Sequence, residues 1–206
     1  MEKTNTLVSV CSLCYNQKEW ICKCIEGILS QKTSFPYEII IHDDCSTDGT
    51  REIVKEYQAR YPYKIKLILP NENQYSKGID MFSKCVEQAR GKYIAWCEGD
   101  DLWTDENKLQ RQVDYLELHP QCSLVYTNTD IFIEKENRIE TNALSSGFIK
   151  PPKTFKEHLK YAGHLAPLTW MFRKDCFVFN SKRYTDWSYS IALDLFAHGE
   201  VHFLNK

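Results

Sequence analysis

The sequence lacks the features that mark several large classes of protein. No apolar run approaches the ~20 residues that a membrane-spanning helix needs, and the polar segment from Met1 to Thr6 has no apolar centre of a secretory signal. Lys and Arg number 26 against 28 Asp and Glu, so the formal net charge is only −2. So small a charge excludes a nucleic-acid-binding protein that depends on bulk positive charge. We therefore expect a cytoplasmic protein with no transmembrane segment and no nucleic-acid partner.

Glycine-rich phosphate-binding motifs are also absent. Neither G-x-G-x-x-G nor G-x-x-x-x-G-K-[ST] occurs, so Rossmann dinucleotide sites and P-loop kinases lack their fingerprints. The segment Asp43-Asp44-Cys45-Ser46-Thr47 does not fit the D-x-D-x-[TV] pattern of phosphatases with an aspartate nucleophile. Hydrophobic residues make up 43% of the 206 residues and charged residues 26%, which is ordinary usage for one folded domain.

The nine cysteines, an odd number, leave two interpretations open. Cys11 and Cys14 form a C-x-x-C, and Cys22 and Cys24 form a C-x-C, so together they could hold zinc. However, Cys22 and Cys24 fall in a helical pattern, where side chains two residues apart point in different directions. No second C-x-x-C or histidine pair follows at the usual spacing. Reduced, mostly buried thiols in a cytoplasmic protein are the preferred interpretation.

Apolar runs of strand type alternate with segments of helical periodicity over the first two-thirds of the chain. Strands are expected at residues 7–11, 37–42, 64–69, 92–97 and 123–133, and helices at 18–31, 46–61, 79–90 and 104–119. This order predicts an α/β fold in which a mainly parallel sheet is flanked by helices. A polar loop is then expected at 134–153, a short helix near 155–161, a strand near 168–172 and a helix at 187–198.

Two acidic clusters directly follow apolar strands. Asp43 and Asp44 follow the second strand, and Glu98, Asp100 and Asp101 follow the fourth. In parallel sheets ligands bind beyond the carboxyl ends of the strands, so both clusters are expected at that edge. Carboxylates gathered together repel one another unless a cation or hydrogen-bond donors neutralise them. Hard oxygen ligands suit Mn²⁺ or Mg²⁺, which predicts a divalent ion holding a phosphorylated ligand. The alternative is that the aspartates are turn residues and helix caps.

These residues and their neighbours resemble the motifs of the family 2 glycosyltransferases. The matching segments are Cys14-Tyr15-Asn16, Asp43-Asp44-Cys45-Ser46-Thr47-Asp48-Gly49-Thr50, Ala89-Arg90-Gly91-Lys92-Tyr93-Ile94, Glu98-Gly99-Asp100-Asp101-Leu102-Trp103, Lys108-Leu109 and Gln112. The resemblance covers essentially the whole chain and implies one domain, 1–206, of the glycosyltransferase A-type fold. Residues up to about 133 would bind the nucleotide sugar, and residues from about 134 to 206 would form the acceptor side.

The resemblance also implies a role for each matching residue. The backbone near Leu13 and the ring of Tyr15 would lie against the nucleotide base, where flat aromatic packing is favourable. Asp44 would accept a hydrogen bond from the base. Asp100 would contact the ribose or the metal shell, and Asp101 would ligate the Mn²⁺ or Mg²⁺ that bridges the diphosphate. Trp103 is expected to pack at the entry to the following helix.

The acceptor side follows from weaker matches. Asp186, just ahead of the helix at 187–198, resembles the acidic residue that acts as catalytic base in the family. Glu98 stands where the family's metal-binding stretch opens with Asp, and it is assigned with His164 and Thr169 to a candidate acceptor cleft. The family normally continues beyond a strand like the one at 201–204. We therefore expect a domain truncated at its C-terminus, which binds nucleotide but transfers sugar poorly.

The implied function is an inverting, metal-dependent glycosyltransferase of the hexosyl or N-acetylhexosaminyl class. The donor would be a nucleotide-diphosphate sugar, most often UDP-linked in this family, and the acceptor a hydroxyl of a glycan or lipid-linked glycan in cell-surface polysaccharide synthesis. Such an acceptor predicts a cytoplasmic enzyme peripheral to the inner face of the membrane. Two alternatives remain: a noncatalytic domain that binds nucleotide sugars or glycans, and a nucleotidyltransferase.

Overall fold

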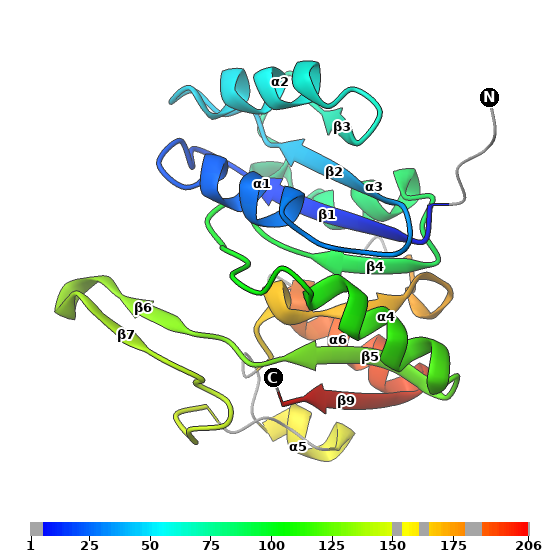
Figure 1. Cartoon of the computed structure of the whole chain (residues 1–206). Helices are drawn as coiled ribbons and strands as arrows, with labels where there is room; N and C mark the ends of the chain where they lie inside the picture. The colour runs from blue at the N-terminus through cyan, green and yellow to red at the C-terminus, as the bar shows by residue number, and fades with distance from the viewer. Residues whose placement is uncertain (1–5, 150–153, 161–164, 180–186, 206) are drawn as a thin grey trace.

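The computed structural model describes residues 6–149, 154–160, 165–179 and 187–205, and a seven-stranded sheet forms its centre (Figure 1). In spatial order the strands are β3 (Ile65–Ile68), β2 (Tyr37–Asp43), β1 (Val8–Cys14), β4 (Tyr93–Trp96), β8 (Met171–Arg173), β5 (Cys122–Thr127) and β9 (Glu200–Leu204). Every neighbouring pair is parallel except the two made by β8, which runs antiparallel to β4 and β5. The predicted α/β fold with a mainly parallel sheet is confirmed.

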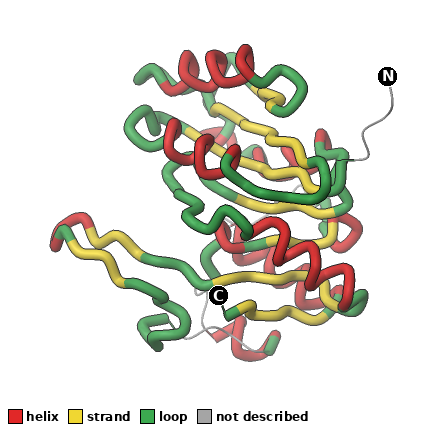
Figure 2. Tube along the Cα trace, in the orientation of Figure 1, coloured by secondary structure: helices red, strands yellow, loops and turns green. Residues whose placement is uncertain are grey.

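Helices cover both faces of this sheet (Figures 1 and 2). They are α1 (Ile21–Leu29), α2 (Thr50–Arg60), α3 (Met81–Gln88), α4 (Lys108–Leu118), α5 (Phe155–Lys160) and α6 (Trp187–His198), with short 3-10 turns η1 (Tyr75–Lys77), η2 (Glu134–Glu136), η3 (Pro167–Thr169) and η4 (Lys174–Cys176). Side chains along β1 alternate between two hydrophobic clusters, because successive strand residues point to opposite faces. Val10 packs in the cluster with α1, α2 and α4, and Leu13 in the cluster with α3 and α6.

The expected strand at 123–133 is wrong as a single element. β5 ends at Thr127, and β6 (Ile131–Ile133) pairs instead with β7 (Arg138–Glu140) in a separate hairpin that projects from the body (Figure 1). Bonds to the segment after β7 accompany the break: a side-chain oxygen of Asn128 accepts the amide of Leu144 at 3.1 Å, and a side-chain oxygen of Asp130 accepts the amide of Asn142 at 2.7 Å. Such side-chain bonds to backbone amides compete with the strand ladder. The polar stretch expected as loop therefore contains a strand.

The strand expected near 168–172 is shorter and begins later. Residues Pro167–Thr169 form η3, and β8 begins at Met171. At its end the Arg173 guanidinium donates from Nε to the carbonyl of Cys122 at 2.8 Å and from Nη2 to the carbonyl of His119 at 3.2 Å. These carbonyls lie just beyond α4, so one arginine fastens the inserted antiparallel strand to the end of that helix.

All nine cysteines are free thiols. Within the described residues, the group of potential metal ligands that could share one ion contains no cysteine. Cys24 is buried on α1 with its Sγ 3.8 Å from that of Cys97, whereas Cys22 is half-buried on a different side of the helix. The preferred interpretation of reduced, mostly buried thiols agrees with this arrangement.

Candidate active site

The carboxyl ends of β1, β2 and β4 meet at one edge of the sheet. β1 lies between the other two and is parallel to both. Beyond the strand ladder, the amide of Asp44 donates to the carbonyl of Cys14 at 2.9 Å and the amide of Gly99 donates to the carbonyl of Leu13 at 2.8 Å. Each acidic segment is therefore fastened to the end of β1, one on either side, as the sequence predicts.

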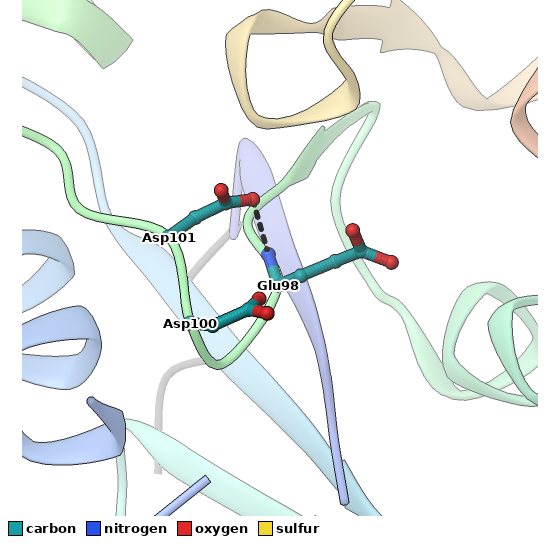
Figure 3. Close-up of side chains that lie close together, drawn as sticks. All are labelled: Glu98, Asp100 and Asp101. Carbon is teal, nitrogen blue, oxygen red and sulfur yellow. Dashed lines mark hydrogen bonds between the residues drawn. The ribbon is translucent and has the colours of Figure 1, made fainter. Parts of the chain in front are cut away.

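The acidic loop, Glu98 to Asp101, brings three carboxylates together (Figure 3). Each of Glu98, Asp100 and Asp101 offers one oxygen, and these oxygens lie within 4.8 Å of one another. Two hydrogen bonds close the loop: the amide of Asp101 donates to the carbonyl of Glu98 at 3.0 Å, and the amide of Glu98 donates to the side-chain Oδ2 of Asp101 at 3.3 Å. The loop thus presents a ready-made cluster of hard oxygen ligands.

The electrostatics of this cluster favour a cation. Burial, and then the neighbouring Asp100 carboxylate, raise the pKa of Asp101 to about 6. A raised carboxylate pKa means that the ionised form is disfavoured where it stands. A divalent ion among the three carboxylates would remove that penalty, and an all-oxygen donor set is the one that Mg²⁺ and Mn²⁺ prefer. The residues present therefore fit the expected metal.

Gly99 explains why the acidic loop can lie so close to β1. A Cβ atom on Gly99 would fall 2.7 Å from Cβ of Cys14 and would also collide with the side-chain oxygen of Gln17. Only a residue without a side chain permits this approach. The packing of the site therefore requires a glycine between Glu98 and Asp100.

The two aspartates at the end of β2, Asp43 and Asp44, have different environments. Asp43 is fully buried and accepts a bond from Nε of Arg51 at 2.6 Å. It therefore anchors α2 and does not belong to the carboxylate cluster of the acidic loop. Asp44 is 1% exposed, and its two carboxylate oxygens accept the backbone amides of Gln74 at 2.6 Å and Tyr75 at 3.0 Å. A carboxylate offers about four lone-pair positions, so Asp44 retains acceptor capacity. Its expected contact with a nucleotide base stays a prediction.

The polar residues after Asp44 hold the turn that carries Tyr15. Four bonds join the turns after β1 and β2: Asn16 amide to Ser46 Oγ at 2.9 Å, Thr47 amide to Asn16 Oδ1 at 2.9 Å, Gln17 amide to Thr50 Oγ1 at 2.9 Å, and Lys18 amide to Asp48 Oδ2 at 3.0 Å. Tyr15 itself, just after β1 at the carboxyl edge, is 49% exposed. A half-exposed flat ring beside the acidic loop is a suitable surface for a nucleotide base.

The structure thus brings Leu13, Tyr15 and Asp44 to the same edge as the acidic loop, which was expected from sequence. Thr169, in η3, is 2% exposed, and its hydroxyl donates to the carbonyl of Ala166 at 2.7 Å, so its place in the acceptor cleft stays a prediction. His164 and Asp186 lie outside the described residues. Their assignments to the acceptor cleft and to base catalysis stay predictions.

A buried polar network behind the acidic loop was missed by sequence reasoning. Trp103 is 5% exposed, which confirms its packing role, and its Nε1 donates to the carbonyl of Leu168 at 2.8 Å. Gln112 donates to the next carbonyl, that of Thr169, at 2.7 Å and accepts a bond from Lys108 Nζ at 2.7 Å. Trp103, just after the acidic loop, and Gln112 of α4 therefore hold η3 by two successive carbonyls. The signal in the sequence was a Lys and a Gln four residues apart on an apolar helix face.

Lys108 is the unusual member of this network. It is 6% exposed, its Nζ lies 4.2 Å from the centre of the Trp103 ring, and burial lowers its pKa to about 7. An unfolded lysine has a pKa of about 10.4. Between pH 7 and about 10 the unfolded chain therefore binds more protons at this position than the folded chain. Linkage then makes the folded state gain stability as pH rises, with a slope of up to about 1.4 kcal/mol per pH unit.

We expect Lys108→Met to remove this pH dependence. Measured by urea unfolding from pH 7.5 to 9 (about the middle of that window), the unfolding free energy of the natural protein should rise relative to that of the variant. The difference in unfolding free energy between the two proteins cancels the contributions of thiols and tyrosines, which titrate in both. Lys55→Met, at an exposed position, is the control and should show a flat difference. A flat difference for Lys108→Met as well would mean that Lys108 titrates normally in the folded protein.

Comparison with known proteins places this chain in a family. Residues 9–178 match the sequence profile of Glycosyl transferase family 2, so the chain belongs to that family. It is 43% identical over 128 residues to the uncharacterized protein Rv1520 of Mycobacterium tuberculosis, covering 62% of this chain and 36% of that protein. It is 32% identical over 159 residues to the Escherichia coli UDP-Glc:alpha-D-GlcNAc-diphosphoundecaprenol beta-1,3-glucosyltransferase WfgD, covering 76% of this chain and 56% of that protein. The chain thus spans between about a third and just over half of these relatives.

Solved structures agree on the fold. The chain superposes on residues 1–349 of Staphylococcus aureus TarS with a TM-score of 0.71 at 19% identity, covering 97% of this chain and 58% of that one. It superposes on the mannosyltransferase PcManGT of Pyrobaculum calidifontis with a TM-score of 0.67 at 17% identity, covering 97% and 55%. The fold is therefore the glycosyltransferase A-type fold. None of the helices in the described part of the chain has the length and apolar character needed to cross a membrane.

Proposed function

We propose that this chain is the donor-binding and catalytic part of a metal-dependent, inverting glycosyltransferase. The donor is a UDP-linked hexose or N-acetylhexosamine, and the acceptor is a hydroxyl group of a glycan or lipid-linked glycan. The observation that carries the proposal is the acidic loop, Glu98 to Asp101, placed beside Tyr15 and Asp44 at the carboxyl edge of a family 2 sheet. Carboxylates and a flat ring at one edge are what a metal-bound nucleotide diphosphate requires.

The related proteins support the donor, the acceptor and the metal of this proposal. WfgD is named for a UDP-glucose donor and a diphosphoundecaprenol-linked acceptor. TarS has been crystallised with UDP and with UDP-GlcNAc, and PcManGT with GDP-Man and Mn²⁺. An acceptor linked to a membrane lipid would place this enzyme in the cytoplasm, peripheral to the inner face of the membrane.

Each site residue then has its own role in the proposed reaction. Asp101 and Asp100 would hold Mn²⁺ or Mg²⁺, which would neutralise charge on the departing diphosphate. Tyr15 lies against the base, and Asp44 accepts a hydrogen bond from it. Asp186 takes the proton of the acceptor hydroxyl as that oxygen attacks the anomeric carbon from the face opposite the diphosphate. Holding donor and acceptor in this orientation supplies much of the acceleration.

The test is a binding screen followed by a transfer assay. UDP-, GDP- and dTDP-sugars are compared by thermal shift with and without Mn²⁺, because a ligand that binds the folded state raises its stability by about 2.7 kcal/mol at 100 times its Kd. We expect the largest shift with a UDP-sugar and Mn²⁺, and release of UDP when an acceptor is added. Binding without transfer would support a noncatalytic binding domain. Pyrophosphate release from UTP would support a nucleotidyltransferase.

A further inference from the structure

The 73–78 turn, Asn73 to Gly78, crosses the carboxyl edge and is anchored there by Asp44. Both carboxylate oxygens of Asp44 accept amides of this turn, and the side-chain amide of Asn73 donates to the carbonyl of Asp44 at 3.3 Å. Gly78 closes the turn in the left-handed region, with φ of 70°. The position of the turn is therefore set by a residue that the proposed function places at the nucleotide base.

The side chain of Tyr75 reaches from this turn to the other half of the protein. Its ring lies 5.8 Å from that of Trp187, at an interplanar angle of 63°, which is an edge-to-face contact. Trp187 is the first residue of α6, and the rest of that helix is held farther along by Ile191, Ala192 and Leu195 in the core. The contact thus lies at the end of α6 that is nearest to the turn.

The position of Trp187 matters because of its neighbour in the chain. Asp186 directly precedes it, and consecutive Cα atoms are ~3.8 Å apart across a trans peptide. Asp186 itself lies outside the described residues, and the structure places only Trp187, the next residue along the chain. In an enzyme that must hold donor and acceptor together, a misplacement of ~1 Å costs on the order of 100-fold in rate.

We propose that Tyr75 is a positioning residue, which sets the start of α6 relative to the donor site through its contact with Trp187. The proposal rests on the proposed function, in which Asp44 serves the donor and Asp186 the acceptor. The chain of contacts runs from Asp44 through the backbone of the 73–78 turn to Tyr75, and from there to Trp187.

The experiment compares Tyr75→Leu with Tyr75→Phe. The phenylalanine keeps the ring edge that meets Trp187, so it should preserve kcat within about 3-fold, whereas the leucine should lower kcat by ~10-fold or more. Affinity for UDP with Mn²⁺, measured by calorimetry, should stay within about 3-fold in both variants, since the Asp44 bonds use only the backbone of Tyr75. Tyr63→Leu, at a 92% exposed tyrosine beside the opposite end of β3, is the matched control.

A second readout does not require sugar transfer. Hydrogen exchange of the amides in the second turn of α6, which donate to the carbonyls of the first turn, should be faster in Tyr75→Leu than in Tyr75→Phe, in the protein without nucleotide. If the natural protein transfers no sugar, the proposed function is wrong. The exchange comparison would still test whether the contact of Tyr75 with Trp187 holds the start of α6. Equal exchange and equal kcat in the two variants would overturn the proposal. A loss of UDP affinity as large as the loss of kcat would also overturn it, because Tyr75 would then be a donor contact.

Discussion

Replacing Asp101 with asparagine should abolish the dependence of UDP binding on Mn²⁺ and leave the fold intact. The asparagine oxygen can still accept the amide of Glu98, which Asp101 accepts at 3.3 Å, so the acidic loop keeps its closing contact. What the variant loses is a charged ligand in a cluster whose oxygens lie within 4.8 Å of one another. Calorimetric titration of UDP with and without Mn²⁺ measures the effect directly.

The expected losses are large. A metal acting on the leaving diphosphate contributes several kcal/mol to the transition state, so transfer should fall by ~10³-fold. Asp114→Asn, at an exposed position on α4, supplies a control with the same chemical change and should retain full activity. Should Mn²⁺-dependent UDP binding survive unchanged in Asp101→Asn, Asp101 is not a ligand, and Glu98 and Asp100 become the residues to substitute.

The second large effect is expected at Asp186, which lies outside the described residues. Asp186→Asn keeps the size of the side chain but removes the group that accepts a proton. General base catalysis is typically worth ~10²–10⁴-fold, so kcat should fall by that order while the Kd of the donor stays nearly constant. Steady-state transfer kinetics together with UDP titration separate the two quantities.

The competing interpretation predicts a different outcome. If Asp186 only caps α6, which begins at Trp187, asparagine should be almost silent, because Asn and Asp are similarly good N-caps. The turnover of Asp194→Asn, a variant with the same change inside α6, is compared with that of Asp186→Asn. Turnover at the natural level in Asp186→Asn would remove it from the mechanism and make Asp194 the next candidate.

Local sequence patterns predicted much of the fold because they report local physical constraints. β1, β2 and β4 are short apolar runs separated by amphipathic segments, and short connections of this kind favour parallel pairing with helices on the faces. Carboxyl ends of parallel neighbours must meet at one edge, so the convergence of Asp44 and Asp101 was predictable without coordinates. The hairpin of β6 and β7 was not predicted, since Asn128 and Asp130 break the strand through bonds to residues far along the chain.

The residues that differ most from expectation are those whose partners are distant in sequence. Asp43 and Asp44 are chemically identical neighbours, yet one is paired with Arg51 and the other holds the 73–78 turn. Nothing in their local sequence distinguishes them, because the difference comes from where α2 and the turn pack. Lys108 likewise looks like a surface lysine in the sequence, and it is buried because its partner Gln112 is bonded to the carbonyl of Thr169, 57 residues farther along the chain.

The sequence by itself determined the class of fold, the edge at which the site lies and the acidic residues that form it, because strand periodicity and motif spacing are properties of consecutive residues. Only the tertiary structure decided the antiparallel insertion of β8 between β4 and β5, the clamp of Asp44 on the 73–78 turn, and the contact of Tyr75 with Trp187. These features depend on which distant segments meet in the folded chain. That is set by the packing of whole elements, which no local pattern encodes.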